Sequence, residues 1–394
     1  MSIRVAVVTT GRADYGLLRP LLTKLEADDR FDLRVMVTGS HLIESQGMTV
    51  QEVESDGHTV TRLPLPNDEQ DSPAATARAI GSLVVSFAES FEGEDLDVVV
   101  LLGDRFEAFA AATSALVMGV PIAHIHGGEI TLGSLDDAFR HAITKMATLH
   151  FASTDEHRRR IIQMGESPRA VFNVGALALD NIRTVTLLSP KAFQEQYGVT
   201  CDDRTLLVTF HPVTGHGDSH AELASLLGAL DAFPGHSVLF TAPNIDAGGH
   251  ETRREIEAWI AANADRAHLV PALGPIGYLS AARNAALVLG NSSSGLIEVP
   301  GLGVPSVDVG TRQTGRVRPA SVLHAEAERA AIVDAVRHAM SDEFRRSAAT
   351  SPNPFGDGHA ADRIVEVLAH EKLARSLGKK QFCDLEFKEP CDAN

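Results

Sequence analysis

Hydrophobic positions along this chain fall in short, strand-sized runs, and segments with helical spacing of apolar residues separate one run from the next. In the first half, the runs predict strands at residues 3–9, 31–38, 97–102, 121–125 and 149–152. Helices are predicted between them, through the leucines of residues 17–25 and over residues 106–118, 135–147 and 154–164. The pattern returns in the second half, with strands predicted at residues 205–210, 237–241, 287–289 and 306–309. This alternation predicts an α/β protein built on parallel sheets with helices on both faces.

The length of 394 residues exceeds the usual size of one compact core, so two domains are expected. We place the first at residues 1–180 and the second at residues 181–360, with the segment 187–200 as the linker region. A last helix, residues 361–377, is expected to cross back onto the first domain. A polar tail, residues 378–394, is expected to lie on the surface.

Composition and charge limit the classes of partner. Hydrophobic residues make up 44% of the chain and charged residues 22%, as is ordinary for a soluble globular protein. The formal net charge of −17 argues against nucleic acid and anionic membranes as partners. The longest apolar runs are shorter than a membrane span, and the N-terminus lacks the regions of a signal peptide. Three cysteines do not make a disulfide framework in such a chain, so a reducing cytoplasm is expected.

The loop Gly290-Asn291-Ser292-Ser293-Ser294-Gly295 carries the clearest chemical signal. It follows a predicted buried strand and leads into a helical pattern. A helix N-terminus offers free N–H groups and partial positive charge, glycine allows close approach of a phosphate, and serine hydroxyls add donors. Glu298 is expected in the first helical turn, where its carboxylate can accept hydrogen bonds from a ribose diol. A nucleotide diphosphate site is therefore predicted at Ser292, Ser293, Ser294, Gly295 and Glu298.

Two polar clusters follow strands of the first domain, at the edge where parallel sheets bind ligands. Asp104 and Arg105 end the strand 97–102. A desolvated Asp104 suits proton transfer, and the alternatives are a helix N-cap or an ion pair with Arg105. In the stretch 124–129, strand alternation would put His124 and His126 on one face, and two glycines before Glu129 would let a ligand approach. No further Cys or His cluster accompanies them, so no metal site is predicted, and His124 can equally be structural.

Further candidates lie at other strand ends. Asp136 and Asp137 begin a helix, and we expect one to cap it and the other to face the ligand. Arg12, in the first strand-to-helix turn, and Arg312 can supply positive charge for phosphate, although an arginine in a turn is commonly solvated. His211 can donate to a phosphate oxygen, transfer a proton, or cap a helix.

Together these motifs resemble the UDP-N-acetylglucosamine 2-epimerase family, and most closely its hydrolysing branch in bacterial sialic-acid and related nonulosonate pathways. The likeness covers most of the chain in the same order. The matching stretches are residues 10–16, 37–41, 103–105, 124–129, 140–146, 211–212, 290–298 and 310–318. The tail, residues 380–385, also resembles this branch, with Cys383 where a tyrosine is common.

The resemblance implies a glycosyltransferase-B-like fold, with two Rossmann-like domains around a central cleft. It implies that UDP is held mainly by the second domain, near His211, Asn244, Ser292, Ser293 and Glu298, with Arg12 and Arg312 at the phosphates. It implies acid–base catalysis by Asp104 and Asp136, while Arg105 and other arginines stabilise the departing charge. His126 stands where vertebrate-type members have a glutamate, so His126 or Glu129 would share the proton transfer.

The implied reaction removes the C2 proton of the sugar while UDP leaves from C1, and water then adds to the 2-acetamidoglycal with inversion at C2. UDP-N-acetylglucosamine and water would give N-acetylmannosamine and UDP, without a redox cofactor or a metal. One alternative is the same reaction on a UDP- or GDP-linked 2,4-diacetamido-2,4,6-trideoxy sugar. The others are a glycosyltransferase of the same fold and a non-catalytic nucleotide-sugar sensor. Related enzymes suggest a homodimer or homotetramer.

Overall fold

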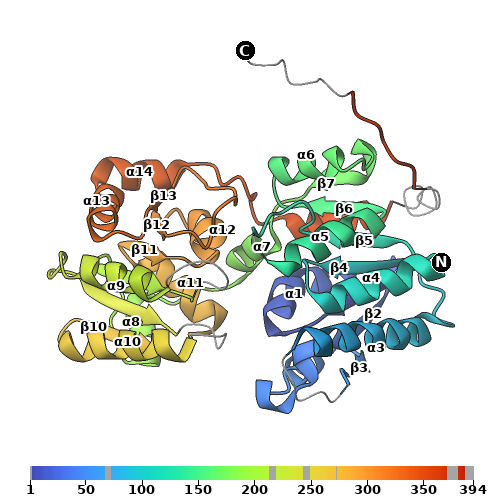
Figure 1. The fold of residues 1–394 in the computed structure, drawn as a ribbon, viewed down its shortest axis with the longest axis horizontal. Helices are drawn as coiled ribbons and strands as arrows, with labels where there is room; N and C mark the ends of the chain where they lie inside the picture. The colour runs from blue at the N-terminus through green and yellow to red at the C-terminus, as the bar shows by residue number, and fades with distance from the viewer. Residues whose placement is uncertain are drawn as a thin grey trace. The chain divides into compact units, whose positions relative to one another are not determined.

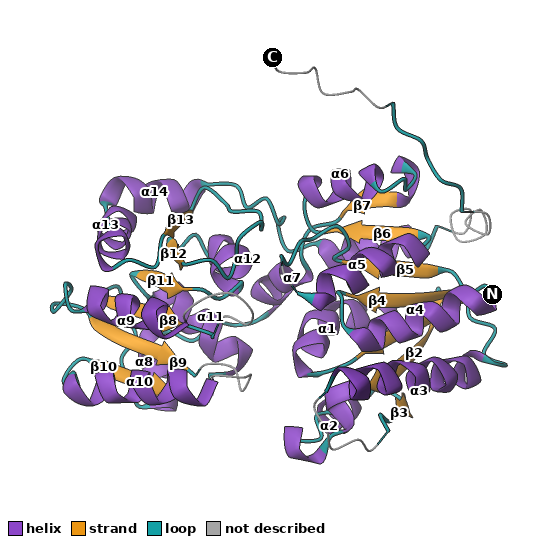
Figure 2. Cartoon of the chain, in the orientation of Figure 1, coloured by secondary structure: helices purple, strands orange, loops and turns teal. Residues whose placement is uncertain are grey.

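The computed structural model describes residues 2–66, 72–132, 134–212, 219–242, 249–271, 273–370 and 380–386. The chain forms two compact units (Figure 1). Unit 1 comprises Met1–Ile130, Ser134–Leu177 and Gly358–Asn394, and unit 2 comprises Thr131–Gly133 and Ala178–Asp357. Helices and strands alternate in both units (Figure 2).

The described residues of unit 1 contain a parallel seven-stranded sheet in the order β3-β2-β1-β4-β5-β6-β7. Its strands are β1 (Ile3–Thr9), β2 (Phe31–Thr38), β3 (Val60–Leu63), β4 (Val98–Leu102), β5 (Ile122–Ile125), β6 (Leu149–Ala152) and β7 (Val171–Asn173). The strand order reverses between β1 and β4, as in doubly wound folds. The carboxyl ends of β1, β4 and β5 therefore lie side by side at the edge where such sheets bind ligands.

Successive side chains of these strands enter two different cores. Val5 and Val7 of β1 pack under α1 (Arg12–Glu26), α2 (Val50–Ser55) and α15 (Ala360–Leu368). Ala6 and Val8 pack under α3 (Pro73–Phe91), α4 (Phe106–Met118) and α5 (Leu135–Met146). Because helices cover both faces, β4 is apolar along its whole length and β1 is apolar and buried over residues 5–8, rather than alternating with polar residues.

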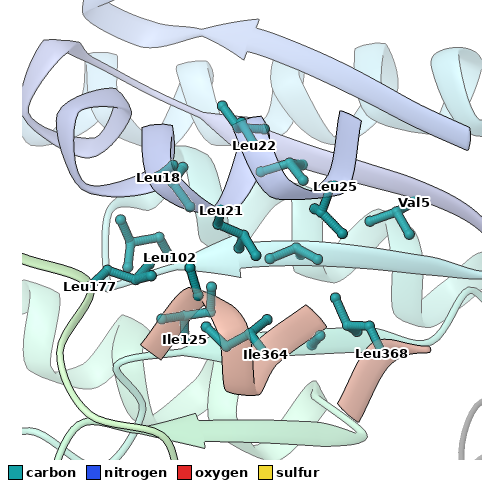
Figure 3. Packing of buried hydrophobic residues seen from close by; sticks show 14 of the residues in the cluster. Val5, Leu18, Leu21, Leu22, Leu25, Leu102, Ile125, Leu177, Ile364 and Leu368 are labelled. Atoms are coloured by element: carbon teal, nitrogen blue, oxygen red, sulfur yellow. The ribbon is translucent and has the colours of Figure 1, made fainter. Parts of the chain in front are cut away.

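Helix α15 completes the first of these cores from the far end of the sequence. Leucines on one face of α1 are fully buried, namely Leu18, Leu21, Leu22 and Leu25. Ile364 and Leu368 of α15 lie in the same cluster, and Figure 3 shows them in one core with the α1 leucines and with Val5, Leu102 and Ile125 of the strands. This face of α1 follows the spacing expected for an amphipathic helix.

The described residues of unit 2 contain a parallel six-stranded sheet in the order β10-β9-β8-β11-β12-β13. Its strands are β8 (Thr205–Thr209), β9 (Ser237–Thr241), β10 (Ala267–Val270), β11 (Leu287–Gly290), β12 (Ser306–Val309) and β13 (Val322–Ala325). Residues of α9 (Ser219–Leu230), α10 (Gly249–Ala262) and α13 (Arg329–Ala339) pack into one core. Residues of α8 (Pro190–Tyr197), α11 (Gly274–Asn284) and α12 (Ser294–Gly301) pack into the other. Helix α6 (Asp155–Gln163) belongs to unit 1, α7 (Leu177–Thr184) contains the division between the units, and α14 (Asp342–Thr350) belongs to unit 2.

The segment predicted as a linker, residues 187–200, belongs instead to unit 2 and is packed onto its core through Phe193. Phe193 of α8 is fully buried and shares a cluster with Leu207 and Leu279. Ser189-Pro190 marks the start of a helix, because Pro190 occupies its first position and the Ser189 Oγ accepts a hydrogen bond from Ala192 N–H at 3.3 Å. The division between the units falls in α7.

Every strand predicted from the hydrophobic runs is present, and no end is displaced by more than one residue. Strands β3, β7, β10 and β13 were not predicted. They are the edge strands of the two sheets, and they are partly exposed and mix apolar with polar residues, so they give no continuous apolar run. Across the described ranges, no helix combines the length and the apolar character needed to cross a membrane.

Candidate active site

Asp104 lies directly after β4, in the turn that leads into α4. Gly103 allows this turn with a φ of +75°, a left-handed conformation. The Asp104 carboxylate pairs with Nη2 of Arg140, a buried residue of α5. Arg140 also donates from Nη1 to the carbonyl oxygen of His126 at 3.1 Å. The N-cap of α4 is Arg105, so the alternative in which Asp104 caps that helix is wrong. A buried arginine thus fixes the orientation of the Asp104 carboxylate.

Arg105, the other predicted partner of Asp104, pairs with Glu107 instead. Its Nη2 lies 3.0 Å from Oε1 of Glu107, whose side chain is 1% exposed. Burial opposes the charge of Arg105, but Glu107, Asp14 and Asp136 outweigh burial and raise its pKa. Arg105 is therefore a fixed positive charge at the ligand-binding edge of unit 1, within electrostatic reach of Asp136.

His126 and Glu129 form a linked pair after β5. His126 lies beyond the end of the strand with a φ of +64°, so the prediction that alternation puts it on the face of His124 is wrong. Its Nδ1 lies 3.4 Å from Oε1 of Glu129. Glu129 also accepts a hydrogen bond from Ser153 Oγ at 2.7 Å and lies 3.7 Å from Nη1 of Arg140.

These contacts determine the ionisation of Glu129. Burial opposes the charged form, but His126, Arg140, His157 and the Ser153 hydroxyl outweigh burial and lower the pKa of Glu129 to about 2. A carboxylate with so low a pKa accepts a proton poorly near neutral pH. Glu129 is therefore suited to orient a neighbouring group rather than to take a proton itself.

His124 has a structural environment. Its ring is completely buried, Nε2 donates to the Gly103 carbonyl oxygen at 2.7 Å, and Nδ1 lies 3.1 Å from Oγ1 of Thr144. Burial lowers the pKa of His124 to about 3, so the ring stays neutral. The sequence left open whether His124 faces a ligand or is structural, and this geometry favours the structural role.

The glycines after His126 let the loop pass close to neighbouring helices. Gly128 has a φ of +76°, and a β-carbon on it would lie 2.5 Å from the carbonyl oxygen of His157 in α6. A β-carbon on Gly127 would lie 2.9 Å from Oγ1 of Thr144 in α5. The glycines were predicted to let a ligand come close to the backbone, but here they let the loop pack closely against α5 and α6.

Helix α5 begins with a serine cap rather than an aspartate cap. The Ser134 Oγ accepts a hydrogen bond from the Asp136 N–H at 3.2 Å, so the prediction that Asp136 or Asp137 is the capping residue is wrong. Asp137 lies 3.5 Å from His141 on the same helix. Asp136 is exposed, and its Oδ2 accepts a hydrogen bond from the Ser134 hydroxyl at 3.1 Å.

The start of α1 supplies one predicted residue and one that was missed. Arg12 is 66% exposed and pairs with Glu52 at 3.2 Å. Asp14 accepts a hydrogen bond from the Thr10 hydroxyl, and burial raises the pKa of Asp14. A carboxyl with a raised pKa at a ligand-binding edge is a candidate for proton transfer. A threonine four residues before an aspartate in the same motif is the signal that could have singled out Asp14.

In unit 2, the serine-rich loop is joined to the loop after β8 through Asn291. Gly290 precedes it with a φ of +136°, and a β-carbon there would lie 1.9 Å from the Thr209 carbonyl oxygen, so only glycine fits. The Asn291 side chain is fully buried. Its Oδ1 accepts a hydrogen bond from the His211 N–H at 2.8 Å, and its Nδ2 donates to the His211 carbonyl oxygen at 2.8 Å. This residue fixes the backbone of His211, and the sequence did not identify it.

Asn291 also anchors the loop after β12. Its carbonyl oxygen accepts hydrogen bonds from Nη1 of Arg312 at 3.0 Å and from Nε2 of Gln313 at 2.7 Å. Three predicted groups, His211, the serines and Arg312, are thus brought to one place by a single residue. All three loops follow carboxyl ends of neighbouring strands, where parallel sheets bind ligands.

The serines lie at the N-terminus of α12. Ser293 is the N-cap but makes no side-chain capping bond, and the Ser294 hydroxyl bonds to the hydroxyl of Tyr278. Glu298 is the fifth residue of the helix and lies in its second turn, not in the first as predicted. Burial raises the pKa of Glu298 to about 7. Protonated and ionised forms of this carboxyl are therefore both accessible near neutral pH.

A cavity of about 10 Å³ lies under this loop, with Thr209, Ser292 and Asp308 in its lining. It has room for about one water molecule, so it is not a space for a nucleotide. Asn244 lies outside the described residues. Within the described ranges, no three His, Cys, Asp or Glu side chains are grouped to hold a metal ion.

The geometry therefore groups the predicted residues in two sets. Unit 1 brings together Asp104, Arg105, His126, Glu129 and Asp136 around Arg140 and α5. Unit 2 brings together His211, Ser292, Ser293, Ser294, Gly295, Glu298 and Arg312 around Asn291 and α12. Arg140, Asp14, Ser153 and Asn291 join these sets although the sequence did not assign them a role.

Comparison with known proteins identifies the family. The sequence profile of the family described as UDP-N-acetylglucosamine 2-epimerase matches residues 23–369. The chain is 33% identical over 384 residues to the polysialic acid biosynthesis protein P7 of Escherichia coli, covering 97% of each chain. It is 32% identical over 385 residues to the GDP/UDP-N,N'-diacetylbacillosamine 2-epimerase (hydrolyzing) of Campylobacter jejuni, covering 97% of this chain and 99% of that protein.

A solved structure shares the fold. The UDP-GlcNAc 2-epimerase of Neisseria meningitidis, determined bound to UDP-GlcNAc, matches with a TM-score of 0.72 and 19% identity. The match covers 92% of this chain and 99% of that chain. The predicted fold class, two parallel α/β domains of glycosyltransferase-B-like type, is confirmed. With the profile covering most of its length and relatives above 30% identity over almost all of it, the chain belongs to the UDP-N-acetylglucosamine 2-epimerase family.

Proposed function

We propose that this protein is a hydrolysing 2-epimerase that converts UDP-N-acetylglucosamine and water into N-acetylmannosamine and UDP. The observation that carries the proposal is the Asp104–Arg140 pair, a carboxylate held in a fixed orientation beside His126 at the ligand-binding edge of a family member. The reaction breaks the C2–H and C1–O bonds, releases UDP, and then adds water across the C1–C2 double bond. The sum of these steps involves no net oxidation, so no redox cofactor is needed.

Nucleotide binding is assigned to unit 2. The free N–H groups at the start of α12 and the hydroxyls of Ser292 and Ser293 offer donors to phosphate oxygens. Arg312 adds a positive charge, and Asn291 holds it in place by accepting its hydrogen bond. Glu298 would accept hydrogen bonds from the ribose in its ionised form. His211, whose backbone is fixed by Asn291, would stabilise the charge that develops on the departing phosphate.

Proton transfer is assigned to unit 1. Asp104 is proposed as the base for the C2 proton, because Arg140 holds its carboxylate in one orientation at the ligand-binding edge of the sheet. His126 is proposed as the second proton-transfer group, with Glu129 as the carboxylate that orients its ring through Nδ1. The low pKa of Glu129 supports this division of roles, since a carboxylate that stays ionised can stabilise a protonated imidazole. Asp136, near Arg105, is proposed to assist on the sugar.

A second substrate has a specific observation in its favour. The relative from Campylobacter jejuni, at 32% identity, is named for a GDP- or UDP-linked diacetylbacillosamine. This chain is therefore also a candidate for hydrolysing 2-epimerisation of a UDP- or GDP-linked 2,4-diacetamido-2,4,6-trideoxy sugar. The two substrates differ at C4 and C6, so the reaction and its catalytic groups would be the same.

The proposal is tested by product analysis with water as the only acceptor. Each nucleotide sugar is incubated with the protein, and the nucleotide and the free sugar are separated by chromatography. Equal amounts of free nucleoside diphosphate and a free sugar with inverted C2 configuration support a hydrolysing epimerase, and the better substrate identifies the sugar. A glycosyltransferase would give no rapid release without an acceptor, and any slow hydrolysis would leave the C2 configuration unchanged. A sensor would bind nucleotide and release nothing.

A further inference from the structure

The C-terminal segment 380–386 is attached to the end of α5 by a lysine. The Lys380 ammonium donates to the carbonyl oxygens of Lys145 and Ala147 at 2.6 Å each and approaches that of Thr144 at 3.4 Å. These carbonyls belong to the last turn of α5 and to its C-cap residue. The last carbonyl groups of a helix have no partner within it, and a positive charge there also complements the helix dipole. Lys380 therefore caps α5 from a distant part of the sequence.

The same ammonium group pairs with a buried carboxylate. Glu166 is 3% exposed, and its Oε2 lies 2.8 Å from Nζ of Lys380 and 3.0 Å from Nε2 of His150. Its Oε1 lies 2.5 Å from Nζ of Lys145. Burial opposes the charge of Glu166, but hydrogen bonds from these three side chains outweigh burial and lower its pKa to about 2. Removing one partner would leave a buried negative charge less well compensated.

Two further contacts hold the segment in place. The Cys383 N–H donates to the Gly165 carbonyl oxygen at 2.9 Å. The Phe382 ring covers Gly165 so closely that a β-carbon there would lie 2.3 Å from it, and the Lys145 ammonium lies 5.0 Å from the ring centre. The segment thus contacts both α5 and the turn before Glu166, rather than only lying on the surface as expected for a polar tail.

Helix α5 connects this attachment to the candidate catalytic residues. Arg140, which orients Asp104, lies one turn before Thr144, whose backbone carbonyl Lys380 approaches. The Thr144 hydroxyl in turn bonds to the Arg140 carbonyl oxygen at 3.0 Å and contacts His124. Asp136 lies in the first turn of the same helix. A displacement of the last turn of α5 can therefore move Asp136, which lies on the same helix, and Asp104, which pairs with Arg140 of that helix.

We propose that Lys380 is a positioning residue for the epimerase reaction: by capping α5 and pairing with Glu166, it fixes the position of Arg140 and thereby the orientation of Asp104. This role depends on the proposed function for its catalytic consequence. The contacts of Lys380 with α5 and with Glu166 do not depend on the proposed function.

The test uses the full-length chain with Lys380→Met, Lys380→Arg and, as a matched control, Gln381→Ala, an exposed residue of the same segment. Lys380→Met keeps the length of the side chain but removes its charge and donors. We expect kcat to fall by about tenfold, within the range that small misplacements cause, while KM and UDP affinity change by less than about twofold. Amide hydrogen exchange should become faster at residues 143–147. Lys380→Arg, which keeps charge and donors, should restore most of kcat and of the exchange protection, and Gln381→Ala should behave as wild type.

Three results would overturn the proposal. The first is a Lys380→Met protein with wild-type kcat or with unchanged exchange at residues 143–147. The second is a parallel loss of kcat, UDP affinity and thermal stability, which would indicate a general structural role. The third is a Lys380→Arg protein as impaired as Lys380→Met. If the wild-type protein turns over none of the nucleotide sugars, the proposed function and the catalytic role of Lys380 are both rejected, while the exchange data still decide whether Lys380 caps α5.

Discussion

Asn291 holds the backbone of His211 at both of its polar groups, with the amide oxygen and the amide nitrogen of one side chain each forming a 2.8 Å hydrogen bond. The side chain is fully buried, so neither bond can be replaced by solvent without rearrangement. Since the carbonyl oxygen of Asn291 also accepts hydrogen bonds from Arg312 and Gln313, one residue joins the three loops assigned to the nucleotide.

Replacing Asn291 with aspartate should therefore weaken both folding and UDP binding. The shape is preserved, but an oxygen would face the His211 carbonyl oxygen in place of a donor. We expect a loss of about 1–3 kcal/mol in the free energy of unfolding, typical for a buried unsatisfied group, together with weaker UDP binding in calorimetry. A variant with lower stability but unchanged UDP affinity would show that these loops do not form the nucleotide site.

Asp104→Asn should separate chemistry from binding. The amide can still accept a hydrogen bond from Arg140 but cannot take a proton, so turnover should fall by at least about 100-fold, the lower end for loss of a general base. UDP affinity should stay close to that of the wild type, because the nucleotide is assigned to unit 2. Steady-state kinetics and UDP calorimetry on the same preparation check both parts. A collapse of UDP affinity would instead make Asp104 a ligand or a structural residue.

The raised pKa of Glu298 should make both the stability of the fold and the binding of ribose depend on pH. Burial raises its pKa from 4.5 to about 7 in the folded protein, so the folded state retains a proton that the unfolded state releases between these values. This group should therefore make the protein less stable as pH rises from about 4.5 to about 7, with no further change above that range. Glu298→Gln should remove this contribution, and denaturant titrations across the pH range measure it.

The same carboxyl should couple ribose binding to proton release. Only the ionised form of Glu298 has the full accepting capacity for ribose hydroxyls, so affinity should rise as pH increases through about 7. Uridine is the suitable ligand, because it lacks the phosphate whose own titration would overlap. Glu298→Gln should bind uridine with little pH dependence over this range. A wild-type affinity that is flat with pH would remove Glu298 from the site.

Gly128 and Gly119 form a matched pair for testing the loop after β5. Both have a left-handed backbone, with φ of +76° and +74°, but a β-carbon on Gly119 has open space whereas one on Gly128 would meet a carbonyl oxygen at 2.5 Å. Gly119→Ala should cost about 1–2 kcal/mol of stability for the backbone conformation alone and should leave kcat unchanged. Gly128→Ala should cost more and should lower kcat, because the loop carries His126 and Glu129. Equal effects in stability and kcat would count against a positioning role for Gly128.

The fold was largely predictable because its strands are buried on both faces. Continuous apolar runs such as residues 5–8 and Val98–Leu102 identify such strands, and the glycine-rich or polar residues after them mark the ligand-binding edge. The edge strand Val60–Leu63 was missed, since two of its four residues are polar and only Leu63 is buried. Residues 187–200 were misread as a linker, because the burial of Phe193 depends on helices much later in the chain.

The candidate site was predictable in its residue types but not in its pairings. Asp104 and Glu129 stand out at strand ends, but only the folded structure shows that Arg140 contacts both of them. The left-handed backbone conformation of His126 ends the alternation of side-chain directions along β5. This conformation was not predicted from the sequence. The docking of Lys380 on α5 joins residues more than two hundred positions apart, a contact that no sequence window contains.

The proposed reaction, loss of the C2 proton with release of UDP followed by addition of water, is tested most directly by proton NMR in deuterated water. The wild-type protein is incubated with UDP-N-acetylglucosamine and with the diacetamido sugar nucleotide, and the C1 and C2 signals are followed with time. We predict that UDP and a free manno-configured sugar appear together and that the sugar carries deuterium at C2 from its first appearance. A free sugar that retains its C2 proton, or a sugar released with unchanged configuration, would contradict the proposed reaction.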